Sequence, residues 1–390
     1  MQTLSLLAAL GLGACHLYTG DAPPDAAGPT APDAAVPDAG LTTTATVACM
    51  PDFGDVAIVA CGFGPSLGVI AVEGDALYAV SAASSYYRVQ QGVGVTPLYH
   101  SNTTQPGLAT AVAGSVFADG AIYFPALVEL GQSSASLGLV AIDADGHTMG
   151  EPRVVTTGEG TEPNAPLVTD GTRLYMASTI SESGGGAYVG PVVQSTLAGP
   201  ALVPSTQDAG SPLAVVDGTL YYLHDNALAR VPLGGGASTE LVAGLDASAW
   251  TDRAVSPTTA YVTLAADPFS IRQVNVTDHS SSVLVTLPVG GEVPIGPPHD
   301  LRYDAGALYF LRDLGTDYAQ LVRLRVDSGP DAIPEVLLQG PGLGVPVFDT
   351  QALYAAYTRG GYDAPIEGVI ARIPKPAPHA RAIATAGSSK

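Results

Sequence analysis

The sequence is poor in positive charge, in tryptophan and in cysteine. Of its 390 residues, 15 are Lys or Arg and 36 are Asp or Glu, which gives a formal net charge of −21. No stretch gathers basic residues with aromatic ones, so the phosphate backbone of a nucleic acid would be repelled. Nucleic acid is therefore excluded as a partner.

Signatures of metal and nucleophile chemistry are also missing. The seven histidines are scattered without an H-x-H or H-E-x-x-H spacing, so no metal site is predicted. "GPSLG" (64–68) has the letters of a nucleophile elbow, but strand-like residues follow where a helix is needed, so Ser66 is predicted as a turn residue. "DADGHT" (143–148) lacks the later ligands of a calcium loop and is predicted as a hairpin turn.

Turn formers and apolar residues are abundant instead. The chain has 46 Gly, 32 Pro and 46% hydrophobic residues, which favours short strands and tight turns around a sizeable core. No helical periodicity of useful length competes with this pattern. The composition predicts an all-β protein.

One tyrosine-centred unit recurs along the chain at intervals of 40 to 52 residues. Each unit has four short runs rich in Val, Leu, Ile and Tyr, separated by clusters of Gly, Asp, Pro and Ser, which predicts four strands joined by turns. The "VVDGTLYYL" segment is typical, with Asp217 and Gly218 in its first hairpin turn. The recurring tyrosines are Tyr78, Tyr123, Tyr175, Tyr221, Tyr261, Tyr309 and Tyr354.

Four-stranded units of this length indicate a seven-bladed β-propeller of four-stranded blades, with the repeats covering residues 69–387. A single sheet of this kind must stack its apolar face on a neighbour, so the tyrosines are predicted to lie between blades. Closure of the ring has two alternatives. The strand predicted at residues 55–62 completes the last blade, or that blade is completed by the strand predicted at residues 380–387.

The loose motifs Asp217-Gly218, Leu220-Tyr221 and Arg230-Val231-Pro232 resemble those of the YWTD, NHL and TolB-like propellers. "YFLRD" (309–313) is the nearest match to the full Tyr-Trp-Thr-Asp signature. The resemblance covers most of residues 56–387 and implies the propeller fold rather than a particular ligand.

The N-terminus resembles the signal peptide of bacterial lipoproteins. An apolar run from Leu4 to Gly13, too short to cross a bilayer, ends in "LGAC" (12–15), which is similar to a lipobox. The resemblance implies cleavage after residue 14 and a lipid on Cys15, and His16 in place of Asp favours the outer membrane of the cell envelope. Plain secretion is the alternative.

The predicted domains are a signal peptide (1–14), an Ala/Pro/Asp-rich disordered tether (15–48), the propeller (49–387) and a short tail (388–390). The tether cannot bury enough apolar surface to fold. If lipid takes Cys15, then Cys49 and Cys61 remain as a candidate disulfide in an exported protein, with two free thiols as the alternative.

Candidate ligand-binding residues follow from the geometry of a four-stranded meander. The connection into the first strand and the connection between the second and third strands lie at the same end of a blade, and ligands meet the residues there. Those residues are Glu162, Asn164, Asp208, His224, Asp225, Trp250, Asp252, Arg253, Asp267, His299, Asp300, Arg312, Asp313, Asp317, Tyr318, Arg359, Tyr362 and Asp363. Ordinary solvated loops are the alternative interpretation.

Two functions are compatible with this sequence. The first is a monomeric, lipid-anchored binding or scaffold module that recognises a protein or glycan at the envelope without a cofactor. The acidic rim would favour a cationic ligand or a divalent cation at the channel mouth. The second is a lyase or hydrolase that uses His299 or His224 as its base, with Asp252, Asp300 or Asp313 beside it.

Overall fold

The computed structural model describes residues 56–375, all within one of the two units into which the chain divides, Thr43–Lys390. Within that range the description leaves out residues 65–66, 82–84, 91–92, 101–107, 112–114, 130–134, 146, 148–152, 158–166, 178–191, 197–198, 203–211, 225, 246–252, 290–294, 316–317, 330–331 and 362–363. The predicted signal peptide, its Cys15, the tether and the strand at 380–387 lie outside the described residues.

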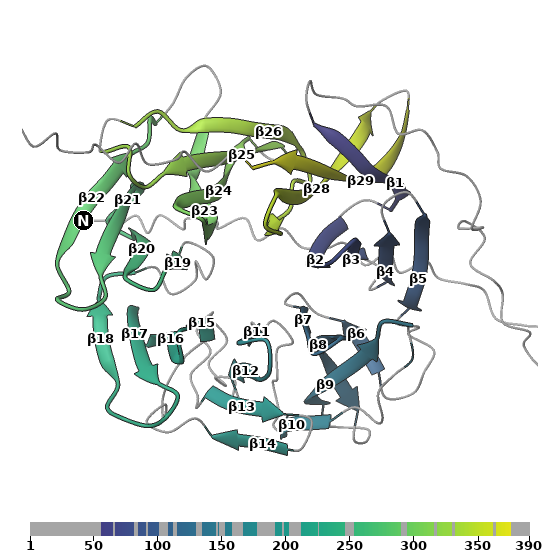
Figure 1. Ribbon diagram of the computed structural model, residues 1–390, viewed down its shortest axis with the longest axis horizontal. Coiled ribbons are helices and arrows are strands. Elements are labelled where there is room, and N and C mark those ends of the chain that lie inside the picture. Colours follow the sequence, from purple (N-terminus) through teal and green to yellow (C-terminus); the bar gives the residue numbers. More distant parts are fainter. Residues whose placement is uncertain are drawn as a thin grey trace, which may run out of the picture. The chain divides into compact units, whose positions relative to one another are not determined.

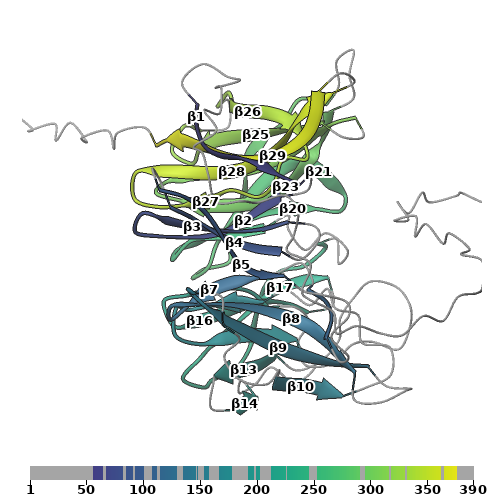
Figure 2. The ribbon, with the colours of Figure 1, turned by 90° about the vertical axis from the view of Figure 1, so that its right-hand side faces the viewer.

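The described residues form strands and no helices, which confirms the all-β prediction. Consequently, none of them belongs to a helix able to cross a membrane. Figure 1 shows the strands grouped into seven sheets around a ring, and Figure 2 shows the same sheets from the side. We number the sheets 1 to 7 along the chain.

Sheet 1 contains β2 (Leu67–Glu73), β3 (Ala76–Ser81), β4 (Ser85–Gln90) and β5 (Gly94–His100). Sheet 2 contains β6 (Leu108–Ala111), β7 (Val116–Ala118), β8 (Ala121–Glu129), β9 (Ala135–Asp143) and β10 (Arg153–Thr157). Sheet 3 contains β11 (Val168–Thr169), β12 (Leu174–Ala177), β13 (Val192–Thr196) and β14 (Gly199–Leu202).

Sheet 4 contains β15 (Pro212–Val216), β16 (Thr219–His224), β17 (Ala227–Pro232) and β18 (Thr239–Val242). Sheet 5 contains β19 (Arg253–Val255), β20 (Thr259–Leu264), β21 (Asp267–Asn275) and β22 (Ser281–Thr286). Sheet 6 contains β23 (Ile295–Asp304), β24 (Ala307–Leu314), β25 (Tyr318–Arg325) and β26 (Glu335–Pro341). Sheet 7 contains β27 (Val347–Phe348), β28 (Ala352–Gly361), β29 (Ala364–Pro374) and β1 (Ala57–Phe63).

The prediction of seven four-stranded blades needs a correction, because the described residues form six sheets of four strands and one of five. Sheet 2 has five, since β8 pairs with two short strands placed along its length. Val116 of β7 pairs with Tyr123, whereas Leu108 of β6 pairs with Val128 near the other end of β8. The inner position of this sheet is thus divided between two segments.

The first of the two closure alternatives is confirmed. β1 pairs antiparallel with β29, so the strand from the N-terminal side completes the sheet formed by the last strands of the chain. A cluster of buried side chains then joins sheet 7 to sheet 1, with Ala60, Phe63 and Tyr354 on one side and Leu77 on the other. The ring is therefore closed by main-chain pairing and by apolar packing.

The tyrosine repeat forms the core between sheets, as predicted. Each of the seven tyrosines lies on the strand that pairs with the innermost strand or strands of its sheet, and has an exposed fraction of 4% or less. Three of them pack against an aromatic ring from the innermost strand of the next sheet. Tyr78–Phe117 and Tyr261–Tyr303 are stacked and Tyr309–Phe348 is tilted, with ring centroids 4.5, 5.6 and 4.9 Å apart.

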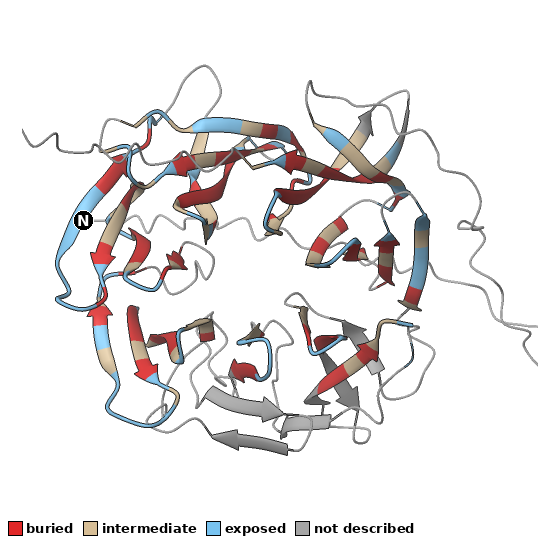
Figure 3. Ribbon diagram, viewed as in Figure 1, coloured by how far each residue is buried: buried red, intermediate tan, exposed pale blue. Residues whose placement is uncertain are grey.

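The predicted hairpin turns are also present. Asp217 and Gly218 have φ values of 48° and 71°, the left-handed conformation that a two-residue type I′ turn needs at both central positions. Figure 3 shows the outer strands carrying much of the exposed surface, while buried residues gather on the strands inside them. The loops at the two ends of the sheets therefore rest on a packed frame.

Candidate functional site

The structure describes half of the eighteen candidate rim residues. Those outside the described residues are Glu162, Asn164, Asp208, Asp225, Trp250, Asp252, Asp317, Tyr362 and Asp363, together with the disulfide candidate Cys49 and with Ser66. Cys61 lies on β1. Because Cys49 lies outside the described residues, the disulfide between them stays a prediction.

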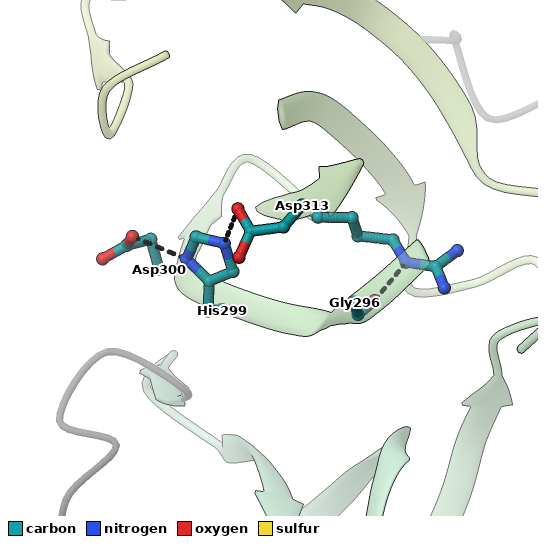
Figure 4. A network of polar contacts seen from close by, with 5 residues as sticks. Gly296, His299, Asp300 and Asp313 are labelled. Atoms are coloured by element: carbon teal, nitrogen blue, oxygen red, sulfur yellow. Dashed lines mark hydrogen bonds and ion pairs between the residues drawn. The ribbon is translucent and has the colours of Figure 1, made fainter. Parts of the chain in front are cut away.

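The rim of sheet 6 brings three of the candidates together. His299 lies between two carboxylates, with its Nδ1 2.9 Å from Oδ2 of Asp300 and its Nε2 3.2 Å from Oδ1 of Asp313 (Figure 4). His299 and Asp300 come from β23, the innermost strand, and Asp313 comes from β24 beside it. We call these three residues the His299 cluster.

A β-bulge explains how two consecutive residues share one cluster. On a regular strand His299 and Asp300 would point to opposite faces of the sheet. The register of β23 against β24 shifts between His299 and Arg302, and Asp300 has a φ of 53°. This left-handed conformation turns the Asp300 carboxylate toward the neighbouring imidazole, at a cost that the surrounding sheet must offset.

A glycine and an arginine fix the other side of the cluster. A Cβ placed on Gly296 would lie 3.3 Å from Cβ of Asp313, so glycine lets β23 approach the end of β24 closely. Arg312 is buried and donates hydrogen bonds from Nε to the carbonyl of Gly296 and from an Nη to the carbonyl of Pro288. These bonds support the strand that carries His299, and the prediction that Arg312 meets a ligand stays a prediction.

The electrostatics of the His299 cluster favour the charged form of its histidine. Burial alone would lower the pKa of His299, but the hydrogen bond and charge of Asp300, and then those of Asp313, outweigh it and raise the pKa. The two ring nitrogens can both donate only when the ring is protonated. The geometry therefore describes an imidazolium held between two carboxylates.

This arrangement is better suited to giving a proton than to taking one. A protonated imidazole with both N–H groups engaged has no lone pair to act as a base, whereas it can act as an acid if a ligand displaces one carboxylate. Among the residues that the structure describes, no group of three or more His, Cys, Asp or Glu could hold a metal ion.

The other described candidates do not join the His299 cluster. Arg253 is almost completely buried, with an exposed fraction of 1%, and Arg359 forms an ion pair with Glu367 across β28 and β29 at 2.5 Å. Tyr318, at the start of β25, has an exposed fraction of 48% and presents a large aromatic surface at the rim. His224 ends β16 and Asp267 begins β21, and both are half-buried.

Sequence reasoning missed Gly296 and Arg302. Arg302 is exposed on the innermost strand, within reach of the charge of Asp300. The alternation in "HDLRYD" (299–304) places Leu301 in the core with Arg302 on the other side, which could have identified this residue. The role of Gly296 depends on a close approach between strands, for which a single sequence gives no signal.

Comparisons with known proteins agree with the fold. No family model matches the chain, and no curated protein matches it. Among solved structures, a prolyl endopeptidase is similar with a TM-score of 0.52 and 14% identity, over 76% of this chain and 46% of that one. A puromycin-hydrolyzing peptidase of Mycobacterium tuberculosis is similar with a TM-score of 0.50 and 16% identity, over 78% and 52%.

A puromycin hydrolase mutant complexed with PGG is similar with a TM-score of 0.51 and 14% identity, over 77% of this chain and 51% of that one. The chain thus spans about half the length of these structures. At such low identity the likeness concerns the fold alone. Together with the ring of sheets, it shows a β-propeller.

Proposed function

We propose that this chain is a lipid-anchored propeller of the cell envelope, related to the YWTD, NHL and TolB-like group, that binds a protein or glycan partner through one end of its ring. The lipobox-like ending at Cys15 supports the anchor, and the Ala/Pro/Asp-rich segment after it supports a tether between lipid and propeller. The net charge of −21 favours protein or glycan partners over polyanions.

The observation that carries the binding proposal is the His299 cluster on a rigid frame. Asp313 lies next to the end of β24, at the hairpin between β24 and β25, and His299 contacts it from the middle of β23. Leu301 and Phe310, on the same two strands, are completely buried. Polar groups held by a packed sheet bind with a small loss of conformational entropy, because little is left to order.

The test is capture of a partner from the native envelope with the full chain and two matched variants. Tyr318→Arg places a bulky charge at the proposed binding end, where this side chain is 48% exposed. Thr258→Arg places the same charge on the exposed turn between β19 and β20, at the other end of the meander. We expect Tyr318→Arg to reduce capture at least tenfold and Thr258→Arg to leave it unchanged.

Capture that is lost equally in both variants, or in neither, would contradict the assignment of the binding end. Both variants should keep the unfolding midpoint of the natural protein, because neither position is buried. This control separates loss of the interface from loss of the fold.

A second candidate is an enzyme, and the proximity of His299 to two carboxylates favours it. In this case the imidazolium would act as a general acid on a leaving group after a substrate displaces Asp313. The double variant His299→Gln, Asp300→Asn should then abolish turnover, whereas a broad binding interface should keep most of its affinity. Partner capture and turnover on envelope glycans and peptides, measured on the same variant, separate the two candidates.

A further inference from the structure

The side chain of His299 joins β23 to β24. Its Nδ1–H reaches the bulged residue of β23, and its Nε2–H reaches the penultimate residue of β24 (Figure 4). Asp313 pairs in register with Ala319 of β25. The contact between His299 and Asp313 therefore also holds the hairpin between β24 and β25 in place. The imidazole therefore affects both the position of the β24–β25 hairpin and the local charge.

Among the described residues, two carboxylates contact His299. Asp300 approaches from β23 and Asp313 from β24, their hydrogen bonds and charges raise its pKa, and the charge of Arg302, also on β23, interacts with Asp300. The guanidinium of Arg312 turns away toward the carbonyls of Gly296 and Pro288. Titration of His299 therefore changes the charge balance between this one ring and two carboxylates.

The two carboxylates differ in how firmly they hold the ring. Asp300 makes the shorter contact, 2.9 Å, and its side chain is 18% exposed. Asp313 makes a 3.2 Å contact, and its side chain is 58% exposed. If only one N–H remains, hydration compensates the exposed Asp313 for the lost hydrogen bond much better than it would compensate Asp300.

We propose that His299 is a pH-responsive clamp, which ties the end of β24 to β23 when the ring is doubly protonated and releases Asp313 when the ring is neutral. The neutral ring keeps its Nδ1–H toward Asp300, and its Nε2 lone pair then faces the Asp313 carboxylate. Two acceptors repel at this distance, so Asp313 moves into solvent and the hairpin that it begins becomes free to shift. The rim of sheet 6 thus has two states selected by proton concentration.

The sign of the linkage follows from the raised pKa. The contribution of the clamp to stability is fully present below the pKa of an unfolded histidine, and it is lost as the pH rises through the higher folded pKa. The clamped rim is therefore the state at mildly acidic pH, and the released rim is the state at higher pH. This inference does not depend on whether the rim binds a partner.

The test is an NMR titration of the full chain labelled with ¹⁵N on histidine and on backbone amides. We expect the His299 midpoint to lie above that of the histidines in the urea-unfolded protein. Its neutral form should carry the proton on Nδ1, and the amide of Ala319 should shift with the same midpoint. In Asp313→Asn the midpoint should fall and the Ala319 transition should disappear.

His279→Asn, on the exposed turn between β21 and β22, is the matched control and should leave the His299 midpoint unchanged. The proposal is overturned by a His299 midpoint at or below that of the unfolded chain, or by a neutral form protonated on Nε2. It is equally overturned by an Ala319 amide that ignores the titration. If Asp313→Asn fails to fold, the tautomer and the Ala319 amide of the natural protein still decide the question.

Discussion

Removal of the Tyr354 hydroxyl should destabilise the propeller through the turn between β27 and β28. Asp349 in this turn accepts hydrogen bonds from the N–H groups of Gln351 and Ala352, both at 2.6 Å, and from the hydroxyl of Tyr354 at 2.8 Å. Burial would raise the pKa of Asp349, but these hydrogen bonds together lower it. The Asp349 carboxylate thus ties the turn to the buried tyrosine of its own sheet.

The expected cost of Tyr354→Phe is about 2 kcal/mol in the free energy of unfolding, since a hydrogen bond to a charged group contributes roughly 1.5 to 3 kcal/mol. The ring of Tyr354 is 2% exposed and packs between sheets 7 and 1, so phenylalanine keeps the apolar contacts. Tyr221 is the matched control, with the same strand position and the same 2% exposure. Val216 stands where Asp349 would be, so Tyr221→Phe should cost within about 0.5 kcal/mol.

Urea-induced unfolding followed by circular dichroism measures both variants. At acidic pH the Tyr354→Phe deficit should shrink, because a carboxylate with a lowered pKa contributes stability that is lost as the pH falls through its folded value. Equal costs for Tyr354→Phe and Tyr221→Phe at neutral pH would refute the reasoning. A deficit that stays constant as Asp349 becomes protonated would also refute it.

Three further predictions concern closure, core and anchor. Deletion of residues 1–63 removes β1 and exposes the edge of β29, so the chain should unfold at lower urea and self-associate in gel filtration, whereas deletion of residues 1–55 should do neither. Phe310→Ala empties a completely buried position between sheets 5 and 6 and should cost about 3–5 kcal/mol in urea unfolding; a cost below that of Tyr354→Phe would contradict the packing described. Cys15→Ser should move the protein from the membrane fraction to the soluble exported fraction on immunoblots, and Cys49→Ser should stay with the membrane; equal fractionation of the two would exclude the lipid anchor.

The repeated features of the fold were predictable from the sequence because each depends on local chemistry. The tyrosines recur at blade spacing, and Asp217-Gly218 is a turn dipeptide whose conformation follows from its own residues. Closure was predicted only as two alternatives, since the pairing of β1 with β29 joins segments about 300 residues apart. The divided inner position of sheet 2 gave no clear signal, because β6 and β7 are both very short.

The sequence predicted which residues lie near one another in the candidate site, but it did not predict their contacts. His299, Asp300 and Asp313 were expected at one end of the ring from strand order alone. Their contacts depend on the left-handed backbone at Asp300, and an aspartate tolerates that conformation without requiring it. Arg312 was also placed at this end from strand order, which gives no sign that its side chain folds back onto β23.

Hydrogen–deuterium exchange of the full chain, free and bound to the captured envelope partner, tests the binding end most directly. We expect new protection where β24 joins β25, around Leu314 to Tyr318, and at the start of β23. We expect no change at the turns between β19 and β20 or between β21 and β22. Protection confined to those turns, or to the outer strands, would contradict the proposal that the partner binds at the end of the ring that carries His299.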